Sequence, residues 1–207
     1  MDYDRAYYEE LRPATGLARF VDDARDRLVA GIVHRHTTTG RVLDVGCGRG
    51  DLLARLGPGI TRFGTELSEA GLDLARARLP DAQLAAGDIQ DGLPFEGPFD
   101  AVTIVNVLEH LTRPDDALGH LAAVQGRDGL LVVHLPTVGN RLQARLYTGS
   151  YDRDPTHVWR PSAADVRARV ERAGYRHVRS GFAPFVPMGI WRHLAIQPAW
   201  LGVFTHR

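Results

Sequence analysis

Short apolar runs alternate with longer amphipathic stretches along most of this chain, and that order restricts the possible folds more than any other feature. Continuous runs of β-branched residues are typical of strands buried on both faces, and the amphipathic stretches between them predict covering helices. The expected strands are residues 41–45, 61–66, 82–86, 99–105, 129–134, 175–182 and 200–205. The sequence therefore predicts a doubly wound α/β fold around a mostly parallel seven-stranded sheet.

Helices are expected between and before these strands. The predicted ranges are 3–12, 17–36, 49–56, 68–79, 114–124 and a last helix that begins at Ser162. Asp165 stands three residues after Ser162, which is the spacing of a capping box, and Gly174 is suited to end that helix. The first two helices are expected to pack across the mouth of the sheet. Residues 137–160 read as an insertion over the sheet edge, and residues 183–199 as a loop.

Charge balance and cysteine count exclude several classes of protein. The chain has 25 basic residues, all arginine, against 25 acidic residues, so it lacks the overall positive field that would hold nucleic acid. The single cysteine, Cys47, excludes an internal disulfide and a multi-cysteine zinc cluster within one chain. The acidic N-terminus is unlike a secretory signal, and the apolar runs are too short to cross a bilayer. We expect a cytoplasmic monomer or homodimer.

A glycine-rich turn follows the first expected strand directly. Its sequence, residues 44–50, is DVGCGRG, and glycines at alternating positions let the backbone approach a ligand where any Cβ would collide. The dinucleotide fingerprint has its third glycine one position later, where this chain has Asp51, so a pyrophosphate would meet a carboxylate. The Gly-Lys-Ser/Thr of a P-loop is also absent from the turn. The turn therefore favours a small ligand that is not strongly anionic.

Carboxylates follow the ends of the first three expected strands. Glu66 ends the second strand, about twenty residues after the turn, where a carboxylate can accept both hydroxyls of a ribose. Asp88 follows the third strand and can accept the exocyclic amine of adenine, while Ile89 packs on the ring. Asp44 adds a negative charge beside the turn. Together they favour a cationic, phosphate-free adenosine as the ligand.

In combination these segments resemble a class I S-adenosylmethionine-dependent methyltransferase of the small-molecule type. The matching pieces are VLDVGCGRG, GTELS, GDIQDGLPF, FDAVTIVNVLEHL with RPDDAL, and GLLVVHLP, which follow the family's order over residues 41–136. The resemblance implies a Rossmann-like fold, S-adenosylmethionine as cofactor and S-adenosylhomocysteine as product. The predicted cofactor residues are Asp44, Gly46, Cys47, Gly48, Gly50, Glu66, Leu67, Asp88, Ile89 and Asn106.

The resemblance also assigns parts of the cofactor to individual residues. It places Gly46, Cys47 and Gly48 along the methionine part, and Asn106 beside the sulfonium. Glu66 would bind the ribose, and Asp88 with Ile89 would hold the adenine.

The second half of the chain extends the resemblance. Thr156-His157-Val158-Trp159 is similar to the Thr-His-x-Trp of ubiquinone-pathway O-methyltransferases, and the segment that ends in Ala-Gly-Tyr is similar to glycan-associated members. Those relatives commonly continue with aromatic residues, whereas this chain continues with Arg160 and Pro161. The resemblance implies O-methylation of a natural product, sugar or quinone-like hydroxyl, with N- or C-methylation as the alternative.

One domain is expected over residues 1–207. Its predicted parts are an N-terminal helical cap (1–36), a cofactor-binding core (41–136), a substrate-side insertion (137–160), and a C-terminal helix with the last strands (161–207).

Methyl transfer needs alignment and exclusion of water rather than a protein nucleophile. A hydroxyl acceptor also needs a base, and histidine is suited to that role near neutral pH. His157, His134 and His110 are the candidates, because strand ends and the insertion would bring them to the crevice. Each has a structural alternative, which for His157 is to pin the insertion.

Further predictions concern the substrate and metal ions. The residues expected to contact the substrate are Tyr8, Arg145, Tyr151 and Trp159. Packing of a terminal helix is the alternative for Tyr8, and solvation at the surface is the alternative for Arg145. No metal site is predicted, because the acidic residues near the crevice already have cofactor roles.

Three other functions compete with small-molecule methylation. A base-flipping methyltransferase usually has two prolines and an aromatic after its polar residue, whereas Asn106 is followed by Val107 and Leu108. A nicotinamide reductase is disfavoured by the glycine spacing and by the lack of any lysine for a Tyr-x-x-x-Lys pair. A protein that binds S-adenosylmethionine without transferring its methyl group is the third alternative.

Overall fold

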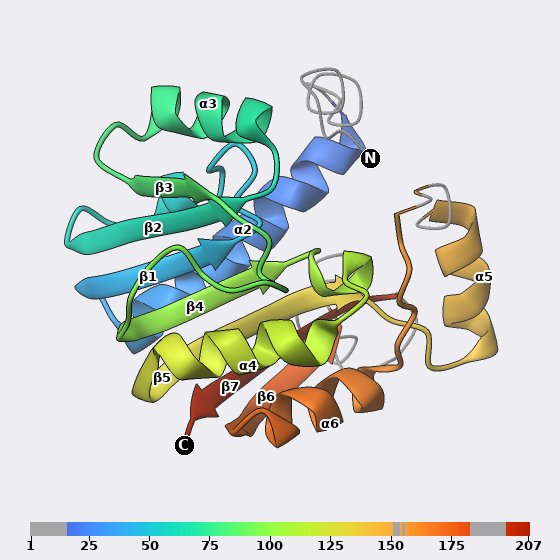
Figure 1. Cartoon of the computed structure of the whole chain (residues 1–207). Coiled ribbons are helices and arrows are strands. Elements are labelled where there is room, and N and C mark those ends of the chain that lie inside the picture. The colour runs from blue at the N-terminus through green and yellow to red at the C-terminus, as the bar shows by residue number, and fades with distance from the viewer. Residues whose placement is uncertain (1–15, 151–153, 155, 183–197) are drawn as a thin grey trace.

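A single seven-stranded sheet forms the centre of the molecule (Figure 1). The computed structural model describes residues 16–150, 154, 156–182 and 198–207. The strands are β1 (Gly40–Val45), β2 (Ile60–Glu66), β3 (Gln83–Ala86), β4 (Phe99–Val105), β5 (Gln125–Pro136), β6 (Tyr175–Phe182) and β7 (Ala199–His206). Their order is β3-β2-β1-β4-β5-β7-β6, and β7 runs antiparallel to the strands on both sides of it, β5 and β6. The predicted α/β class and mostly parallel sheet are confirmed.

Helices cover both faces of this sheet (Figure 1). The helical elements are α2 (Leu17–His36), η1 (Leu53–Arg55), α3 (Glu69–Arg78), η2 (Leu108–His110), α4 (Pro114–Val124), α5 (Arg141–Ser150) and α6 (Ala163–Arg172). One apolar core lies between the sheet and α4 with α6, and a second lies between the sheet and α2, η1 and α3. None of the helices in the described ranges is both long enough and apolar enough to span a bilayer.

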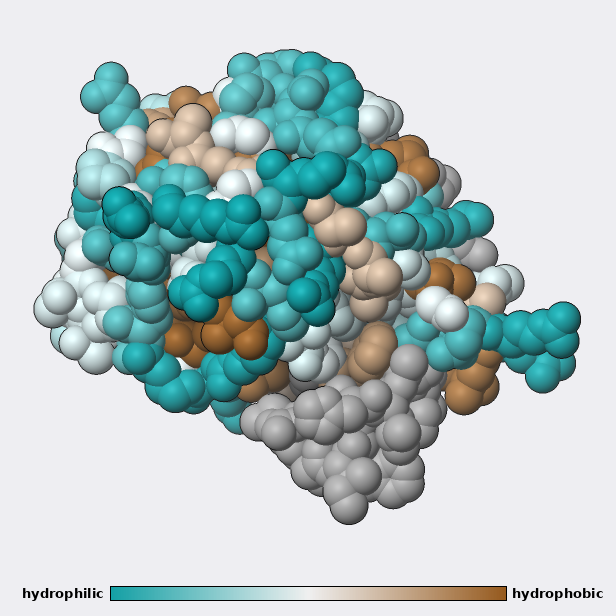
Figure 2. All heavy atoms as spheres, turned by 90° about the horizontal axis from the view of Figure 1, so that it is seen from below, coloured by the Kyte–Doolittle hydropathy of each residue, from teal (hydrophilic) through white to brown (hydrophobic). Residues whose placement is uncertain are grey.

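Alternation along the strands supplies both cores at once. Leu43 and Val45 of β1 pack toward α4 and α6, whereas Val42 between them packs toward α2. Successive side chains of a strand point to opposite faces, so a strand covered on both sides is apolar at most positions, and Asp44 is the polar exception in the buried part of β1. The outer surface seen from below Figure 1 is mostly hydrophilic, with small apolar patches (Figure 2). Most apolar side chains of α4 and α6 are therefore turned inward, against the sheet.

Two expected elements differ from the structure. Residues 49–56 form no α-helix and contribute only the single turn η1. The backbone of Gly46, Gly48 and Gly50 has positive φ, so the turn continues to residue 50, and Pro58 soon follows, which leaves little room for a helix. The expected strand 129–134 is the middle of the longer β5.

The N-terminal and insertion regions also differ from expectation. Helix 17–36 forms as predicted, but Val29, Ile32 and Val33 pack on one face of the sheet rather than across its mouth. The region 137–160 contains α5, which was not predicted as a helix. The expected helix 3–12 and residues 183–197 of the expected loop lie outside the described residues.

Helix caps agree with the sequence. The Ser162 side chain accepts from the Asp165 amide, and the Asp165 side chain accepts from the Ser162 amide, so the capping box before α6 is confirmed. Ser68 caps α3 by accepting a hydrogen bond from the Gly71 amide. Each of these caps satisfies backbone donors that have no partner inside the helix.

Asp44 is a buried carboxyl in the middle of the sheet. The Thr103 hydroxyl of β4 donates to Asp44 Oδ1 on β1 over 2.7 Å. Burial raises the pKa of Asp44 to about 7; the bond from Thr103 opposes this shift, and the Asp26 carboxylate adds to it. The folded chain therefore binds a proton at Asp44 over a pH range in which the unfolded chain has released it.

That difference predicts a pH dependence of stability. Because the folded-state pKa is the higher one, the free energy of unfolding should fall as the pH rises from about 4 to about 7. Asp44→Asn keeps the side-chain shape without the charge, so the variant should gain about 1 kcal/mol or more relative to wild type between about pH 5 and about pH 8. Urea unfolding at a series of pH values measures this difference. Asp73→Asn on α3 is the exposed control, and parallel curves for wild type and Asp44→Asn would contradict the assignment.

Candidate active site

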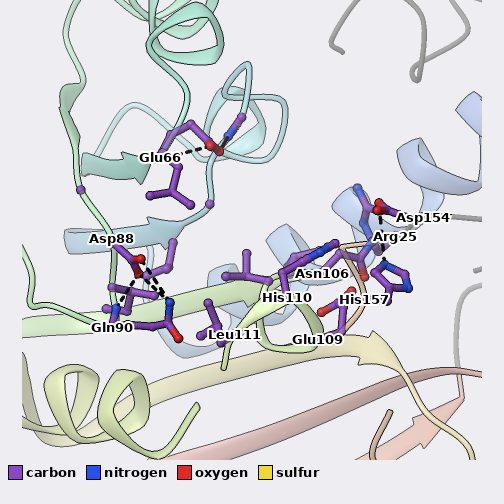
Figure 3. A pocket seen from close by; sticks show the side chains of 18 of the residues that line it. Arg25, Glu66, Asp88, Gln90, Asn106, Glu109, His110, Leu111, Asp154 and His157 are labelled. Atoms are coloured by element: carbon purple, nitrogen blue, oxygen red, sulfur yellow. Dashed lines mark hydrogen bonds and ion pairs between the residues drawn. The ribbon is translucent and has the colours of Figure 1, made fainter. Parts of the chain in front are cut away.

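A cavity of about 340 Å³ opens where β1, β2 and β4 end (Figure 3). The side chains that line it come from α2, the strand ends, η2 and the segment after α5. The described lining residues are Asp22, Arg25, Val45, Gly46, Gly48, Glu66, Leu67, Gly87, Asp88, Ile89, Gln90, Val105, Asn106, Val107, Glu109, His110, Leu111, Asp154 and His157. Ligands of doubly wound sheets bind at this edge, outside the carboxyl ends of the strands.

The glycine turn forms one wall of the cavity. The amides of Gly46 and Cys47 both donate to the Thr65 carbonyl, at 2.8 and 2.9 Å, which fastens the turn to β2. Gly46 has a φ of 70°, and a Cβ there would lie 2.3 Å from the Val107 side chain. Glycine is required at this position both by backbone conformation and by space.

Glu66 is held by three backbone amides. Its Oε2 accepts from Gly48 at 2.9 Å, and its Oε1 accepts from Leu67 at 2.8 Å and Ser68 at 3.1 Å. A carboxylate has about four acceptor sites, so one remains for a ligand. The side chain is half-buried and lines the cavity, so it can accept one further hydrogen bond from a ligand, rather than the two expected from the sequence for a ribose.

Asp88 and Ile89 lie further along the same wall. Asp88 Oδ1 accepts from the Gln90 amide at 2.8 Å, and the Gln90 side chain also contacts the carboxylate. Ile89 is 4% exposed and presents an apolar surface beside it. A flat ring with an exocyclic amine would meet a carboxylate and an apolar contact here.

Asn106 is positioned by His134. Its φ is 53°, which is rare outside glycine but tolerated by asparagine. The Asn106 amide donates to the His134 carbonyl at 2.7 Å, and His134 Nδ1 donates to Asn106 Oδ1 at 2.9 Å. His134 is 4% exposed and is not among the described residues that line the cavity. The prediction that placed His134 at the crevice is therefore corrected, because the ring is buried and supports Asn106.

Two histidines and two carboxyl groups gather at the other end of the cavity (Figure 3). His110 Nδ1 lies 2.8 Å from Thr156 Oγ1, and His157 Nδ1 lies 3.2 Å from the Tyr147 hydroxyl. The two imidazole rings meet edge to face, with centroids 4.6 Å apart. One donor atom each from Glu109, His110 and His157 lies within 4.8 Å of the other two. The sequence predicted no metal site and did not predict this grouping.

Burial sets the charge of this cluster. Glu109 is 1% exposed, and its Oε2 has no hydrogen-bond partner in the described part of the chain. Burial raises the pKa of Glu109 to about 8, so the group is mostly protonated at neutral pH. Burial also lowers the pKa of His110 and opposes its protonation. Burial raises the pKa of Asp154 as well, but the hydrogen bonds from Thr156, together with the nearby His110 and His157, outweigh it, so the net shift is downward.

Arg25 enters the cavity from α2 with its charge already paired. Its guanidinium donates to Asp26 at 2.8 Å and to Asp22 at 2.7 Å. It is the one arginine among the described lining residues, which also include the carboxylates of Asp22, Glu66, Asp88 and Asp154. Carboxylate groups therefore outnumber the positive charges around this cavity.

The structure brings together most, but not all, of the predicted cofactor residues. Those that line the cavity are Gly46, Gly48, Glu66, Leu67, Asp88, Ile89 and Asn106. Cys47 turns its side chain into the core, where burial raises the pKa of the thiol. Gly50 packs closely against the side chain of Leu79, the residue that follows α3. Asp44 is buried in the sheet behind the turn. These three are absent from the described lining residues.

The predicted substrate residues do not line the described cavity or lie outside the described residues. Arg145 is exposed on α5, and Trp159 packs against the core beneath the Arg169 guanidinium, 5.1 Å from its ring centroid. Neither is among the described residues that line the cavity, so the structure does not bring them to it, and their contact with a substrate stays a prediction. Tyr8 and Tyr151 lie outside the described residues.

Several lining residues were missed by the sequence interpretation. Glu109 stands inside the VLEHL segment quoted for the family resemblance, and Asp154 stands three residues before His157. Their proximity to predicted site residues could therefore have indicated that they belong to the site. Arg25 and Asp22 gave no such signal, because an ion pair on a predicted helix usually lies on its solvated face.

Comparisons with known proteins support a family assignment. A model described as a methyltransferase domain matches residues 9–180. The chain is 32% identical over 117 residues to the mitochondrial ubiquinone biosynthesis O-methyltransferase of Schizosaccharomyces pombe, covering 52% of this chain and 41% of that protein. It is 39% identical over 111 residues to the dTDP-3-amino-3,6-dideoxy-alpha-D-glucopyranose N,N-dimethyltransferase of Streptomyces fradiae, covering 51% and 43%. The matches thus span less than half the length of these two curated relatives.

A solved structure shares the whole fold. The magnesium protoporphyrin IX methyltransferase of Synechocystis PCC 6803, solved with bound S-adenosylhomocysteine, superposes with a TM-score of 0.74 at 18% identity and covers 99% of this chain and 94% of its own. At this identity the likeness shows the fold. The family model, in contrast, matches far more than half of the chain, and this chain therefore belongs to the methyltransferase domain family.

Proposed function

We propose that this chain transfers a methyl group from S-adenosylmethionine to a hydroxyl oxygen of a small molecule, such as a natural product, a sugar or a quinone-like compound. The observation that carries the proposal is one continuous cavity. It joins the glycine turn, Glu66 and Asp88 at one end to Glu109, His110 and His157 at the other. The first group suits a nucleoside, and the second suits removal of a proton.

The cofactor end fits a cationic adenosine. Glu66 would bind the ribose, Asp88 and Ile89 would hold the adenine, and Gly46, Gly48 and Asn106 would line the methionine part. The surrounding carboxylates favour a positively charged ligand over a phosphate, because no unpaired arginine lines the described cavity. When bound, S-adenosylmethionine supplies a methyl group activated by a positively charged sulfur.

The acceptor end supports transfer to oxygen. A neutral hydroxyl becomes a good nucleophile when a base takes its proton, and two imidazoles line this end. Val107 and Leu111 line the cavity beside them and keep part of its wall apolar, which helps to exclude water. The name of the Schizosaccharomyces pombe relative, an O-methyltransferase, supports the same chemistry.

Other outcomes remain distinguishable. The Streptomyces fradiae relative is named for N-methylation of a sugar amine, so methyl transfer to nitrogen is the nearest alternative, followed by transfer to carbon. The proposed acceptor is a small molecule rather than nucleic acid, acted on in the cytoplasm by a monomer or homodimer.

Titration calorimetry with S-adenosylmethionine, S-adenosylhomocysteine and NADH separates a methyltransferase from a nicotinamide reductase.

Glu66→Gln should weaken binding of S-adenosylmethionine about tenfold or more. The glutamine side chain keeps one acceptor oxygen, but an NH₂ group replaces the other. That group cannot accept the hydrogen bonds that ribose hydroxyls or backbone amides donate to the carboxylate. Titration calorimetry measures the dissociation constant. Glu69→Gln, an exposed change on α3, is the matched control and should bind as the wild type does. Equal affinity of Glu66→Gln and wild type would contradict the ribose contact.

The wild type should add the mass of one CH₂ group to a hydroxylated acceptor and release S-adenosylhomocysteine. Mass spectrometry over a panel of phenols, sugars, carboxylic acids and amines detects the product, and fragmentation locates the methyl group. Binding of S-adenosylmethionine with no transfer to any acceptor would support a binding protein instead. Methylation of amines alone would replace the oxygen proposal with the nitrogen alternative.

A further inference from the structure

A chain of hydrogen bonds ends at His110. The carboxylate of Asp154 accepts from both the amide and the hydroxyl of Thr156, and the amide bond measures 2.9 Å. Thr156 Oγ1 lies 2.8 Å from His110 Nδ1. Asp154 and His110 both line the cavity. We call these residues the Asp154-Thr156-His110 chain.

The direction of these bonds fixes the proton on the imidazole. An ionised carboxylate can only accept, so the single hydroxyl hydrogen of Thr156 is donated to Asp154. Toward His110 the hydroxyl then has only lone pairs to offer, and the proton of that bond must belong to His110 Nδ1. In neutral imidazole a protonated Nδ1 leaves the lone pair on Nε2. His110 is therefore set as a hydrogen-bond acceptor at Nε2.

His157 lacks this arrangement. Its Nδ1 faces the Tyr147 hydroxyl, its Nε2 lies 4.0 Å from Asp154 Oδ2, and its side chain is 7% exposed. Both ring nitrogens therefore have protein groups beside them. For His110, within the described residues, no hydrogen bond reaches Nε2. Of the two imidazoles in the cavity, His110 is the one with a nitrogen available to an acceptor.

The same cluster resembles the donor set of a metal site, and two observations favour proton transfer over a cation. The rings of His110 and His157 are already packed against one another. Glu109 is 1% exposed and burial favours its protonated form, so a cation would have to displace that proton to gain the carboxylate as a ligand. The titratable groups beside His110 are Glu109, His157 and Asp154, and the ion-paired Arg25 lines the same cavity.

We infer that His110 is the proton acceptor of the proposed methyl transfer and that Thr156 and Asp154 are positioning residues that set its tautomer. This inference rests on the proposed function. His110 Nε2 takes the proton of the acceptor hydroxyl, the oxygen lone pair forms the new O–CH₃ bond, and the C–S bond breaks with its electron pair going to sulfur. The imidazolium is stabilised by Asp154 through Thr156 and later releases its proton to water.

The tautomer can be tested without any turnover. Nitrogen-15 NMR of uniformly labelled protein, with His110→Gln to assign the signal, should show a protonated Nδ1 and an unprotonated Nε2 for His110. Thr156→Val should shift that signal toward the Nε2-protonated form, and Thr156→Ser should restore it. An Nε2-protonated His110 in the wild type would overturn the inference, and this result does not depend on finding an acceptor.

Kinetics test the role in catalysis. His110→Gln should lower kcat about 100-fold, and Thr156→Val should lower it about tenfold and move the acid limb of the pH profile, with rescue by Thr156→Ser. Binding of S-adenosylmethionine should stay unchanged in all three. Thr61→Val, an exposed change on β2, is the matched control. Wild-type kcat in His110→Gln would overturn the inference while leaving methyl transfer itself intact.

The cation alternative has its own readout. When Zn²⁺ alone is titrated into the wild type and into His110→Gln, we expect the same result for both proteins, with no stoichiometric binding that depends on His110. One tightly bound Zn²⁺ per chain, lost in His110→Gln and required for activity, would replace the inferred base with a metal site.

Discussion

The bond from the Gly48 amide to Glu66 connects the two halves of the cofactor end. Gly48 belongs to the turn after β1, and Glu66 is the last residue of β2, so one carboxylate fixes how two neighbouring strand ends lie relative to each other. It can do so because glycines with positive φ let the turn stay tight. If the turn relaxed, the Gly46 and Cys47 amides would also lose their common acceptor, the Thr65 carbonyl. The wall of the cavity depends on this small set of bonds.

Features with a local cause were predictable from the sequence. Most of the seven strands follow from apolar runs, and the cap of α6 follows from the spacing of Ser162 and Asp165. Helix α5 was missed because its pattern misleads: Leu142 and Leu146 are exposed, whereas Gln143 and Tyr147 are buried. Its buried side is fixed by Tyr147 meeting His157 and by Gln143 bonding to Gly139, contacts that no hydrophobic period encodes.

The candidate site divides in the same way. Residues at strand ends, such as Glu66, Asp88 and Asn106, were predictable because parallel strands bring their carboxyl ends to one edge. His134 also ends near that edge, but sequence could not tell that its ring turns inward to Asn106. The sequence also could not tell that Glu109 is buried while its neighbour His110 is half exposed. Both residues belong to the short turn η2, and their burial is decided by the segments that pack around that turn.

One bond between main-chain atoms ties the segment after α5 to the rest of the site. The Trp159 amide donates to the Glu109 carbonyl at 3.0 Å, joining that segment to η2. Because neither partner in this bond is a side chain, the residues around it can be exchanged without releasing the attachment. Substitutions can therefore alter the side chains at this end of the cavity while the segment after α5 stays attached to η2.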